Sequence, residues 1–416
     1  MDFEADIVRV GAQGDGMTET GRAIALGLPG EHVKARSVTD RSGKTHNRLI
    51  GVMTPSPERV VPPCPHFEAC GGCALQHWEM SAYSAWKRDL VQTTLERAGF
   101  NIDCAPIVTT PLHSRRRAGL HARKVGKTVE IGFKARRSWD LVPIHTCPIT
   151  DPAIVAALPA LKALAAGLFE HPKSAPILHV TASLTGLDID ISGVERGKSG
   201  GLSADARMTI AMTAAEADFA RVTIAGEIAY GARPPMVRFG RAAVELPAGS
   251  FLQATPQAEK AMVDLVTAGI GNASRVADLF CGAGTFTFPL AEKAVVQAID
   301  GSAPAIAALK RAIATAPGLK TINVEARDLF RRPLLAAEMR ELEAVVFDPP
   351  RAGAEAQAHE IAASKVGRVV AVSCNPQTFV RDAKILSDAG FSLDSVTPID
   401  QFLWSSHVEL VAVLSR

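Results

Sequence analysis

Two side chains near the C-terminal end of the chain could together perform covalent catalysis. Cys374 follows the apolar run Val369–Val372, and Glu409 lies in the last apolar run of the sequence. A thiolate that adds to carbon 6 of a pyrimidine makes carbon 5 nucleophilic, so that carbon 5 can take a methyl group from a sulfonium. A base must then remove the proton on carbon 5. We therefore predict Cys374 as a nucleophile and Glu409 as a base; the alternative is that Cys374 is an inert core residue.

An acidic motif is expected at the same edge of a sheet. Asp348–Arg351 (Asp-Pro-Pro-Arg) follows the apolar run Ala344–Phe347, just as Cys374 follows its own run. Carboxyl ends of parallel strands meet at one edge, where doubly wound folds bind their ligands. Methyltransferases that act on exocyclic amines use a similar Asp-Pro-Pro followed by an aromatic residue that stacks on the base. Arg351 stands at that position here, which argues against methylation of an amine.

A glycine loop after a predicted strand could hold a nucleoside. Gly282 and Gly284 follow the apolar run Val276–Phe280, and glycines let the backbone approach a ligand at the start of a helix. Asp300 ends the next apolar run, 16 residues after Gly284, where a carboxylate can hydrogen-bond both ribose hydroxyls. The third glycine of dinucleotide-binding loops is missing. The loop therefore favours a single nucleoside such as S-adenosylmethionine, with an ordinary tight turn as the alternative.

Four of the seven cysteines are spaced like metal ligands. They are Cys64, Cys70, Cys73 and, far downstream, Cys147. An odd number of cysteines in a chain without a secretory leader argues against a disulfide framework and for metal-binding or catalytic thiols. Four thiolates can hold zinc or an iron–sulfur cluster, and the spacing does not separate the two. We interpret the remaining Cys104 and Cys281 as packing residues.

The elements that must position these residues change along the chain. Residues 1–56 contain short strand-like segments broken by glycines, which predict a small β-barrel. Residues 57–246 are mostly strand-like and include the four spaced cysteines, and a helix expected over about residues 78–100 would pack on the C-terminal domain. In residues 247–416, strand-length and helix-length segments alternate. That pattern predicts the α/β class with a doubly wound sheet.

Composition excludes several classes of protein. The chain has 416 residues, of which 47% are hydrophobic and 21% are charged, and these values rule out a disordered, collagen-like or coiled-coil chain. The segment Met1–Asp6 is acidic and carries no apolar run, so no secretory signal is expected. The most apolar stretch, residues 152–169, is interrupted by Pro159 and Lys162 and is too short to span a bilayer. We therefore expect a cytoplasmic protein with no membrane contacts.

The net charge of +2 predicts no partner, but the charges are unevenly distributed. Nine basic side chains lie between Asn101 and Thr150, against three acidic ones. The basic residues are Arg115, Arg116, Arg117, Arg123, Lys124, Lys127, Lys134, Arg136 and Arg137. A local positive field suits a nucleic-acid backbone, and the alternative is a solvated surface without a partner.

Five motifs in a fixed order carry a resemblance to a known family. They are Phe251-x-Gln253, Asp278-Leu-Phe-Cys-Gly-x-Gly284, Asp348-Pro-Pro-Arg351, Ser373-Cys374-Asn375-Pro376 and His407-Val-Glu409. This set resembles the RNA uridine-C5 methyltransferases, which use S-adenosylmethionine, and it covers the chain from Phe251 to the C-terminus. The resemblance implies a class I, Rossmann-like methyltransferase domain over residues 247–416. It also implies Cys374 as nucleophile and Glu409 as the base for the carbon-5 proton.

The resemblance further implies which residues line the cofactor and active-site region. They are Gln253, Phe280, Thr285, Asp300, Asp328 and Asp348. The chain departs from the common family pattern at two places. Thr255 follows Gln253 where members commonly have Phe-x-Gln-x-Asn, and Leu403 and Trp404 stand where many members have Pro-His. Neither departure removes a catalytic group, and both concern contacts with the substrate.

The segment Cys70–His77 resembles the cluster site in the ribosomal RNA branch of this family. That resemblance implies a 4Fe-4S cluster, in preference to zinc, and 23S ribosomal RNA as the substrate. The implied ligands are Cys64, Cys70, Cys73 and Cys147. It also implies that residues 1–56 form a TRAM-like barrel of the OB type, that residues 57–246 form a central iron–sulfur domain, and that the enzyme is a monomer.

Three alternatives stay open on the sequence. One is the same reaction on tRNA, which the four cysteines disfavour. A second is a non-catalytic RNA-binding protein on this fold, which the presence of both Cys374 and Glu409 disfavours. A third is a cytosine-C5 methyltransferase, which needs a donor to N4 and usually a different motif around the thiol. In each catalytic case the target base must leave its stack, because the thiol approaches carbon 6 from the face of the ring.

Overall fold

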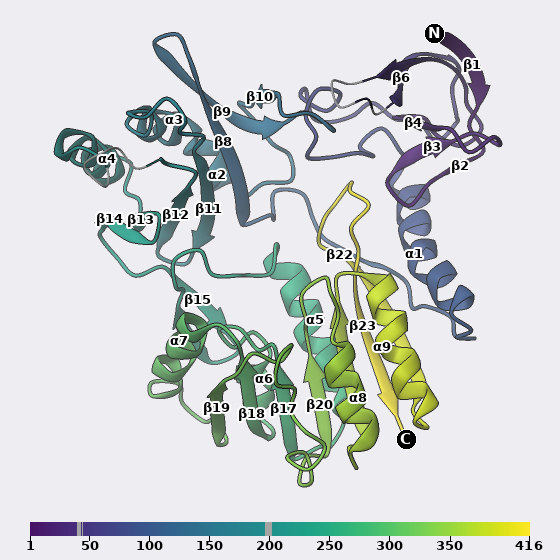
Figure 1. The fold of residues 1–416 in the computed structure, drawn as a ribbon, viewed down its shortest axis with the longest axis vertical. Coiled ribbons are helices and arrows are strands. Elements are labelled where there is room, and N and C mark those ends of the chain that lie inside the picture. Colours follow the sequence, from purple (N-terminus) through teal and green to yellow (C-terminus); the bar gives the residue numbers. More distant parts are fainter. Residues whose placement is uncertain (40–42, 44, 196–201) are drawn as a thin grey trace.

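The computed structural model describes residues 1–39, 43, 45–195 and 202–416, and their strands form four sheets (Figure 1). A six-stranded sheet contains the N-terminal strands, a seven-stranded sheet and a two-stranded hairpin follow, and an eight-stranded sheet contains the C-terminal strands. In Figure 1 the eight-stranded sheet and its helices occupy the lower half, and the six- and seven-stranded sheets lie above. None of the helices in the described ranges is long and apolar enough to cross a membrane.

The eight-stranded sheet has the doubly wound α/β arrangement that the alternation of segments predicted. Its strands are β7 (Val108–Thr109), β17 (Arg275–Leu279), β18 (Val295–Asp300), β19 (Ile322–Ala326), β20 (Ala344–Phe347), β21 (Arg368–Ser373), β22 (Ser392–Asp400) and β23 (Glu409–Ser415). The helices of this part are α5 (Pro256–Gly269), α6 (Thr287–Ala291), α7 (Ala303–Ile313), α8 (Glu355–Ala363) and α9 (Pro376–Asp388). The strand order is β19-β18-β17-β20-β21-β23-β22-β7, and β23 is antiparallel to both of its neighbours. The order reverses between β17 and β20, and the carboxyl ends of strands at such a reversal are where these folds bind ligands.

Separate apolar cores lie on the two faces of this sheet. All four residues of β20 are buried, as expected for a parallel strand covered by helices on both faces. Val346 packs in the same core as Met262 of α5, whereas Val345 packs in the core that holds Phe379 of α9. Successive residues of the strand therefore serve opposite faces, which fixes the sheet between its two helical layers.

Helix α1 (Met80–Arg97) and strand β7 come from the middle of the chain but belong to this C-terminal unit. Val91 and Leu95 of α1 lie in the core that contains Phe379 of α9. β7 pairs in parallel with the end of β22. The helix expected over about residues 78–100 thus lies against α9, at the right of the sheet in Figure 1.

The seven-stranded sheet occupies most of the middle of the chain. Its strands are β8 (Arg117–Val125), β9 (Thr128–Lys134), β10 (Leu141–Pro143), β11 (Ile177–Ser183), β12 (Gly186–Ser192), β13 (Arg221–Ile224) and β14 (Glu227–Gly231), in the order β10-β9-β8-β11-β12-β13-β14. Helices α2 (Pro152–Ala156), α3 (Leu158–Ala166) and α4 (Ala204–Glu216) contribute to its core. The hairpin of β15 (Met236–Phe239) and β16 (Ala242–Glu245) follows this sheet but packs against α7, so it shares its core with the C-terminal sheet.

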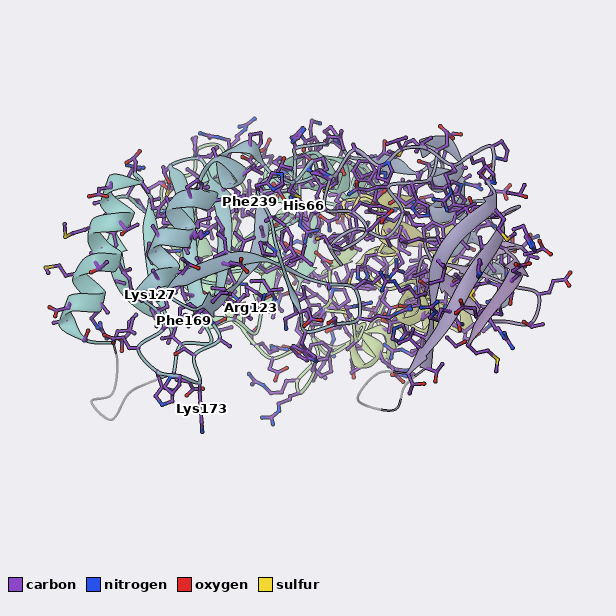
Figure 2. The ribbon with its side chains drawn as sticks, turned by 90° about the horizontal axis from the view of Figure 1, so that it is seen from above. His66, Arg123, Lys127, Phe169, Lys173 and Phe239 are labelled. Atoms are coloured by element: carbon purple, nitrogen blue, oxygen red, sulfur yellow. The ribbon has the colours of Figure 1, made fainter. Side chains whose placement is uncertain are left out.

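The basic segment between residues 101 and 150 is not one surface. Arg123 and Lys127, labelled in Figure 2, are exposed near the end of the β8–β9 hairpin. Arg116, in contrast, is buried in an ion pair with a carboxylate of α5. Arg136 donates a hydrogen bond to Asp15 of the N-terminal sheet at 2.7 Å. Some of the basic side chains that we predicted to face RNA therefore bind carboxylates and carbonyls within the protein. These contacts join its elements to each other.

The N-terminal sheet is small and is attached to the middle of the chain by charged side chains. It contains β1 (Asp2–Asp6), β2 (Arg9–Val10), β3 (Asp15–Met17), β4 (Ala23–Ala25), β5 (His32–Thr39) and β6 (Thr45–Thr54), in the order β1-β5-β6-β4-β3-β2. Its buried core includes Ile24 and Val33. Asp15 accepts hydrogen bonds from both Arg136 and Arg137. The TRAM-like barrel stays a prediction, because this strand order does not test it.

A buried ion pair fixes the chain after β22. Lys87 of α1 pairs with Asp400, and both side chains are fully buried. The Lys87 ammonium also donates hydrogen bonds to the Tyr83 hydroxyl and to the Phe402 carbonyl, each at 3.0 Å. The Tyr83 hydroxyl in turn donates to the second Asp400 oxygen at 2.6 Å. Helix α1 thus holds the residues on both sides of position 401.

We expect Lys87→Met to destabilise the C-terminal unit strongly. The substitution leaves the Asp400 carboxylate buried without its counter-charge, which costs about 3–5 kcal/mol in the free energy of unfolding. A urea titration measures this loss. Lys260→Met is the matched control, because Lys260 forms an exposed ion pair with Asp264, and such pairs contribute little. Equal small losses for the two variants would contradict the anchoring role of Lys87.

Candidate active site

A pocket of about 970 Å³ opens at the carboxyl ends of the parallel strands of the eight-stranded sheet. Seven of the predicted catalytic and cofactor residues line it: Gln253, Phe280, Asp300, Asp328, Asp348, Cys374 and Glu409. Thr285, the remaining one, is half-buried in the turn before α6 and is not part of the lining. The fold therefore brings residues from seven separate segments into one space.

The glycine loop and Asp300 form one half of the pocket. Asp300, at the end of β18, accepts hydrogen bonds from the backbone N–H groups of Gly282 at 2.9 Å and Ser302 at 2.6 Å. Gly284 has φ of +104°, and a Cβ atom there would lie 2.7 Å from the Phe288 ring. Glycine is therefore required at this turn, both by its backbone conformation and by the close packing of α6.

Aromatic rings flank the same half of the pocket. Phe280 has φ of +61°, and its ring centroid lies 5.4 Å from that of Phe330. Asp328 accepts a hydrogen bond from the Phe330 backbone N–H at 3.0 Å, and all three residues line the pocket. Two rings and two carboxylates can hold the flat base and the hydroxyls of a nucleoside. Phe330 is absent from the motif-based prediction, and its position two residues after Asp328 is the only sequence signal for it.

Asp278 lies beneath the glycine loop and is only partly satisfied. The Thr287 hydroxyl donates to one carboxylate oxygen at 2.5 Å, and the other oxygen has no hydrogen-bond partner among the described residues. Burial raises the pKa of Asp278 to about 7. Asp278 does not line the pocket, and its hydrogen bond from Thr287 joins the end of β17 to the start of α6.

Cys374 follows β21 and is half-buried in the other half of the pocket. Burial raises the pKa of its thiol to about 11, and the nearby Glu409 and Asp348 raise it further, whereas Arg351 lowers it. At neutral pH the free protein therefore holds Cys374 as a thiol. Its activation requires that a substrate or a neighbouring group take the proton.

Glu409 is the first residue of β23 and is buried. Burial raises the pKa of its carboxyl to about 7, against the lowering effects of the hydrogen bond from Gln401 and of the charges on Lys87 and Arg351. A carboxylate whose pKa lies near neutral pH is well matched to proton removal at that pH.

A chain of amide groups links the residues of this half. The Gln401 amide nitrogen donates to Glu409 Oε1 at 3.0 Å and to Gln253 Oε1 at 2.9 Å. The Gln253 amide nitrogen donates to Asp348 Oδ2 at 3.1 Å. Burial, with the nearby charge of Glu409, raises the pKa of Asp348 well above its usual range. Gln401 was not predicted from the sequence, because a single glutamine directly after a strand belongs to no recognisable motif.

The segment that carries Gln253 is clamped by two arginines at the start of β8. Arg116 donates from its backbone N–H to the Ala254 carbonyl at 2.9 Å and from its side chain to the Gln253 carbonyl at 3.0 Å. Arg117 donates to the Leu252 carbonyl at 2.9 Å. These contacts join the seven-stranded sheet to the pocket, and their long separation in sequence hides them from motif analysis.

The outer wall of the pocket is basic and aromatic. The Arg115 guanidinium lies 5.5 Å from the centroid of the Phe402 ring, and the His407 ring meets Phe402 edge-on at 5.9 Å between centroids. Arg117 lies 5.5 Å from the centroid of the exposed Phe251 ring. Cations over aromatic rings at the mouth of a pocket are suited to unpaired nucleotides, whose bases stack and whose phosphates are anionic.

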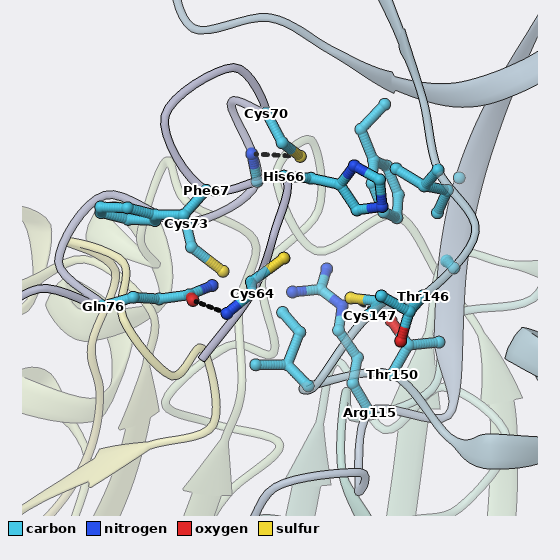
Figure 3. A pocket seen from close by; sticks show the side chains of 16 residues that line it. Cys64, His66, Phe67, Cys70, Cys73, Gln76, Arg115, Thr146, Cys147 and Thr150 are labelled. Carbon is cyan, nitrogen blue, oxygen red and sulfur yellow. Dashed lines mark hydrogen bonds between the residues drawn. The ribbon is translucent and has the colours of Figure 1, made fainter. Parts of the chain in front are cut away.

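The four spaced cysteines line a second cavity of about 220 Å³, which adjoins the first. Figure 3 shows the sulfurs of Cys64, Cys73 and Cys147 turned toward the same space as the Arg115 guanidinium. Arg115 lines both cavities. Cys104 and Cys281, which we predicted as packing residues, are buried in the apolar cores.

The cysteine cavity does not present a site for a single metal ion. No group of three or more His, Cys, Asp or Glu side chains in the described ranges could hold one ion. The Arg115 side chain, which lines this cavity, donates to the Arg117 carbonyl at 3.0 Å. Burial lowers the pKa of Arg115.

Comparisons with known proteins identify the family of the chain. Residues 240–416 match the family model of the tRNA (uracil-5-)-methyltransferases. The chain is 59% identical to an uncharacterised RNA methyltransferase of Caulobacter vibrioides, over 98% of both chains. It is 30% identical to the 23S rRNA (uracil(1939)-C(5))-methyltransferase of Alkalilimnicola ehrlichii, over 96% of this chain and 95% of that one.

A solved structure shares the fold over the full length. The tRNA (uracil-54, C5)-methyltransferase of Pyrococcus abyssi, in complex with S-adenosyl-L-homocysteine, superposes with a TM-score of 0.75 at 23% identity, covering 99% of each chain. The similarity to this structure and to the sequence relatives therefore extends over nearly the whole chain and is not confined to one domain. The chain is an RNA methyltransferase and belongs to the family that acts on carbon 5 of uracil.

Proposed function

We propose that this enzyme transfers a methyl group from S-adenosylmethionine to carbon 5 of a specific uridine in 23S ribosomal RNA, through a covalent bond between Cys374 and carbon 6. The observation that carries the proposal is one pocket lined by a thiol, a buried carboxyl group with a pKa of about 7 and a nucleoside-binding half. Family membership supports the same reaction class.

In this mechanism the Cys374 sulfur bonds to carbon 6, and the electron pair of the C5=C6 bond moves toward O4 to give an enolate. The thiol gives its proton to solvent water in this step and regains a proton when the S–C6 bond breaks. Arg351, which lowers the pKa of that thiol, lines the same pocket. S-adenosylmethionine supplies the methyl group that carbon 5 takes, and S-adenosylhomocysteine is the leaving group. Glu409 then removes the proton from carbon 5, the C–H electron pair restores the C5=C6 bond, and the S–C6 bond breaks.

The nucleoside half of the pocket supports binding of S-adenosylmethionine. Asp300 lies at the end of β18, where it can accept hydrogen bonds from ribose hydroxyls. Phe280 and Phe330, which both line the pocket, provide apolar faces for the adenine ring. Thr285 does not line the pocket, so we no longer assign it a contact with this molecule.

Two observations favour 23S ribosomal RNA over tRNA. The named 23S enzyme aligns with nearly the whole chain, and four cysteines border one cavity beside the pocket. The tRNA alternative rests on the family model and on the Pyrococcus abyssi structure, whose 23% identity concerns the fold. We also propose that the enzyme works in the cytoplasm as a monomer, as the resemblance to its family implies.

We further propose that the four cysteines Cys64, Cys70, Cys73 and Cys147 bind a 4Fe-4S cluster. When bound, the cluster supplies iron–thiolate bonds that join the segment before α1 to the segment after β10. Arg115 would gain the negative counter-charge that it lacks among the described residues. Because Arg115 also reaches the Phe402 ring, the cluster supports the wall of the active site and needs no redox role.

Covalent trapping tests the roles of Cys374 and Glu409. RNA that carries 5-fluorouridine at the target forms a stable adduct with the native enzyme, because fluorine on carbon 5 cannot be removed as a proton. Cys374→Ala should form no adduct, since no sulfur can bond to carbon 6. Glu409→Gln should form a persistent adduct even with ordinary RNA, and its turnover should fall about 10²–10⁴-fold. Denaturing electrophoresis of the protein–RNA complex measures both effects.

Cys104→Ala is the matched control for trapping, because Cys104 is a buried core cysteine outside the pocket lining and outside the glycine loop. It should form the adduct like the native enzyme. An adduct with Cys374→Ala would remove Cys374 as the nucleophile. Normal turnover by Glu409→Gln would remove Glu409 as the base without affecting the assignment of Cys374.

The metal content tests the cluster. Protein purified without oxygen should contain about four iron atoms and four acid-labile sulfides per chain, as a 4Fe-4S cluster requires. Cys147→Ala should lose most of this iron, whereas Cys104→Ala, which removes a core thiol far from the cavity lining, should keep it. Stoichiometric zinc without iron would contradict the cluster.

A further inference from the structure

Gln401 is a buried side chain at the centre of the active-site hydrogen bonds, with only 2% of its surface exposed. We propose that Gln401 is a positioning residue that fixes the Glu409 carboxylate and the Gln253 amide in their working orientations. The proposal rests on the proposed function, because it takes Glu409 as the base for the carbon-5 proton. It concerns a residue outside the motifs that indicate the family.

The orientation of the Gln401 amide is determined by the backbone. The Ala254 N–H donates to Gln401 Oε1 at 2.9 Å, so the amide oxygen must face Ala254. The amide nitrogen then faces Gln253 Oε1 at 2.9 Å and Glu409 Oε1 at 3.0 Å. If the amide were reversed, its oxygen would face two other acceptor oxygens, those of Gln253 and Glu409. Its nitrogen would face the Ala254 N–H, which is also a donor. Because the site is buried, the observed orientation is strongly favoured.

This arrangement divides the two oxygens of Glu409 between different tasks. Oε1 accepts from Gln401, whereas Oε2 has no hydrogen-bond partner among the described residues, and Glu409 lines the pocket. Oε2 is therefore the oxygen left to take a proton from a substrate. A donor on Oε1 also favours the charged form of Glu409, which is the form that acts as a base.

Gln253 is fixed by the same contact. Its Oε1 is occupied by the Gln401 amide, so its own amide nitrogen must face Asp348, to which it donates at 3.1 Å. One side chain thus sets the donor and acceptor ends of Gln253 and the free oxygen of Glu409 together. Neither orientation follows from the backbone positions of these two residues alone.

Gln401 is itself held from both sides. Asp400 pairs with Lys87 of α1, and the Lys87 ammonium also donates to the carbonyl of Phe402. The Thr110 hydroxyl donates to the Asp400 carbonyl at 2.7 Å. With both neighbours in place, the amide of Gln401 has little freedom to follow a moving substrate.

The charged and titratable groups that act on Glu409 come from several elements. Lys87 of α1 and Arg351 after β20 lower its pKa. Its charge in turn raises the pKa of Asp348 and of Cys374. Removal of the Gln401 donor leaves these charges unchanged, so a shift in the pKa of Glu409 can be assigned to the lost hydrogen bond.

The test compares Gln401→Met with Gln357→Met in the full-length enzyme. Methionine matches the length of glutamine but offers no hydrogen bond. Gln357 is equally buried and bonds only to the backbone of Leu334, outside the pocket, so its variant controls for the loss of a buried amide. The probe is transcribed 23S ribosomal RNA with S-adenosylmethionine, and the measured step is release of methylated RNA from the covalent adduct.

We expect Gln401→Met to slow this release by about 10²-fold, as small misplacements of a reacting group do. The acid limb of the release rate should move to higher pH, because loss of the donor raises the pKa of Glu409. Gln401→Glu should be slowed at least as much, since it places an acceptor against Glu409. Gln357→Met should release product at the native rate, although both Met variants lose thermal stability.

Two results separate this inference from the proposed function. If Glu409→Gln accumulates adduct but Gln401→Met releases product as fast as Gln357→Met, with an unchanged pH profile, the positioning role of Gln401 is wrong and the mechanism stands. If Glu409→Gln turns over normally, the assignment of the base is wrong, and the inference falls with it.

Discussion

A thiol and two carboxyl groups share one buried pocket, and the surrounding contacts depend on the electrostatics of that arrangement. Burial raises the pKa of Cys374 to about 11 and that of Glu409 to about 7, and the negative charge of Glu409 raises the pKa of Asp348 as well. Lys87 and Arg351 oppose this effect. At neutral pH Cys374 therefore keeps its proton, whereas Glu409 is partly ionised and can act as a base.

Much of what positions these groups comes from outside the C-terminal span. Helix α1 fixes the end of β22 through Lys87, and the start of β8 clamps the segment around Gln253 through Arg116. Arg115 lies between the pocket and the cavity of the four cysteines. The active site on the C-terminal sheet thus depends on contacts with α1 and with the start of β8, which precede that sheet in the sequence. This dependence gives a physical reason why the domains occur in one chain.

The sequence allowed prediction of the doubly wound sheet and of the meeting of Asp348, Cys374 and Glu409, because strand-end residues of such a sheet share an edge. It did not reveal Gln401, whose partners are set by packing. The basic residues near Arg116 were expected on an RNA surface because charge alone indicates solvent exposure. Their acceptors lie more than a hundred residues away in the chain, beyond any local pattern. Cysteine spacing likewise predicts four ligands, but spacing alone does not separate zinc from an iron–sulfur cluster.

The central claim is methylation of carbon 5 of a uridine in 23S ribosomal RNA, and the most direct measurement is of the modified nucleosides themselves. Mass spectrometry would quantify 5-methyluridine in 23S ribosomal RNA and in tRNA, purified separately from a strain that lacks this gene. The account predicts loss of 5-methyluridine from 23S ribosomal RNA, with recovery on return of the native gene and none with Cys374→Ala. Loss from tRNA alone would contradict the substrate, and unchanged 5-methyluridine in both pools, when the parent strain expresses the protein, would contradict the reaction.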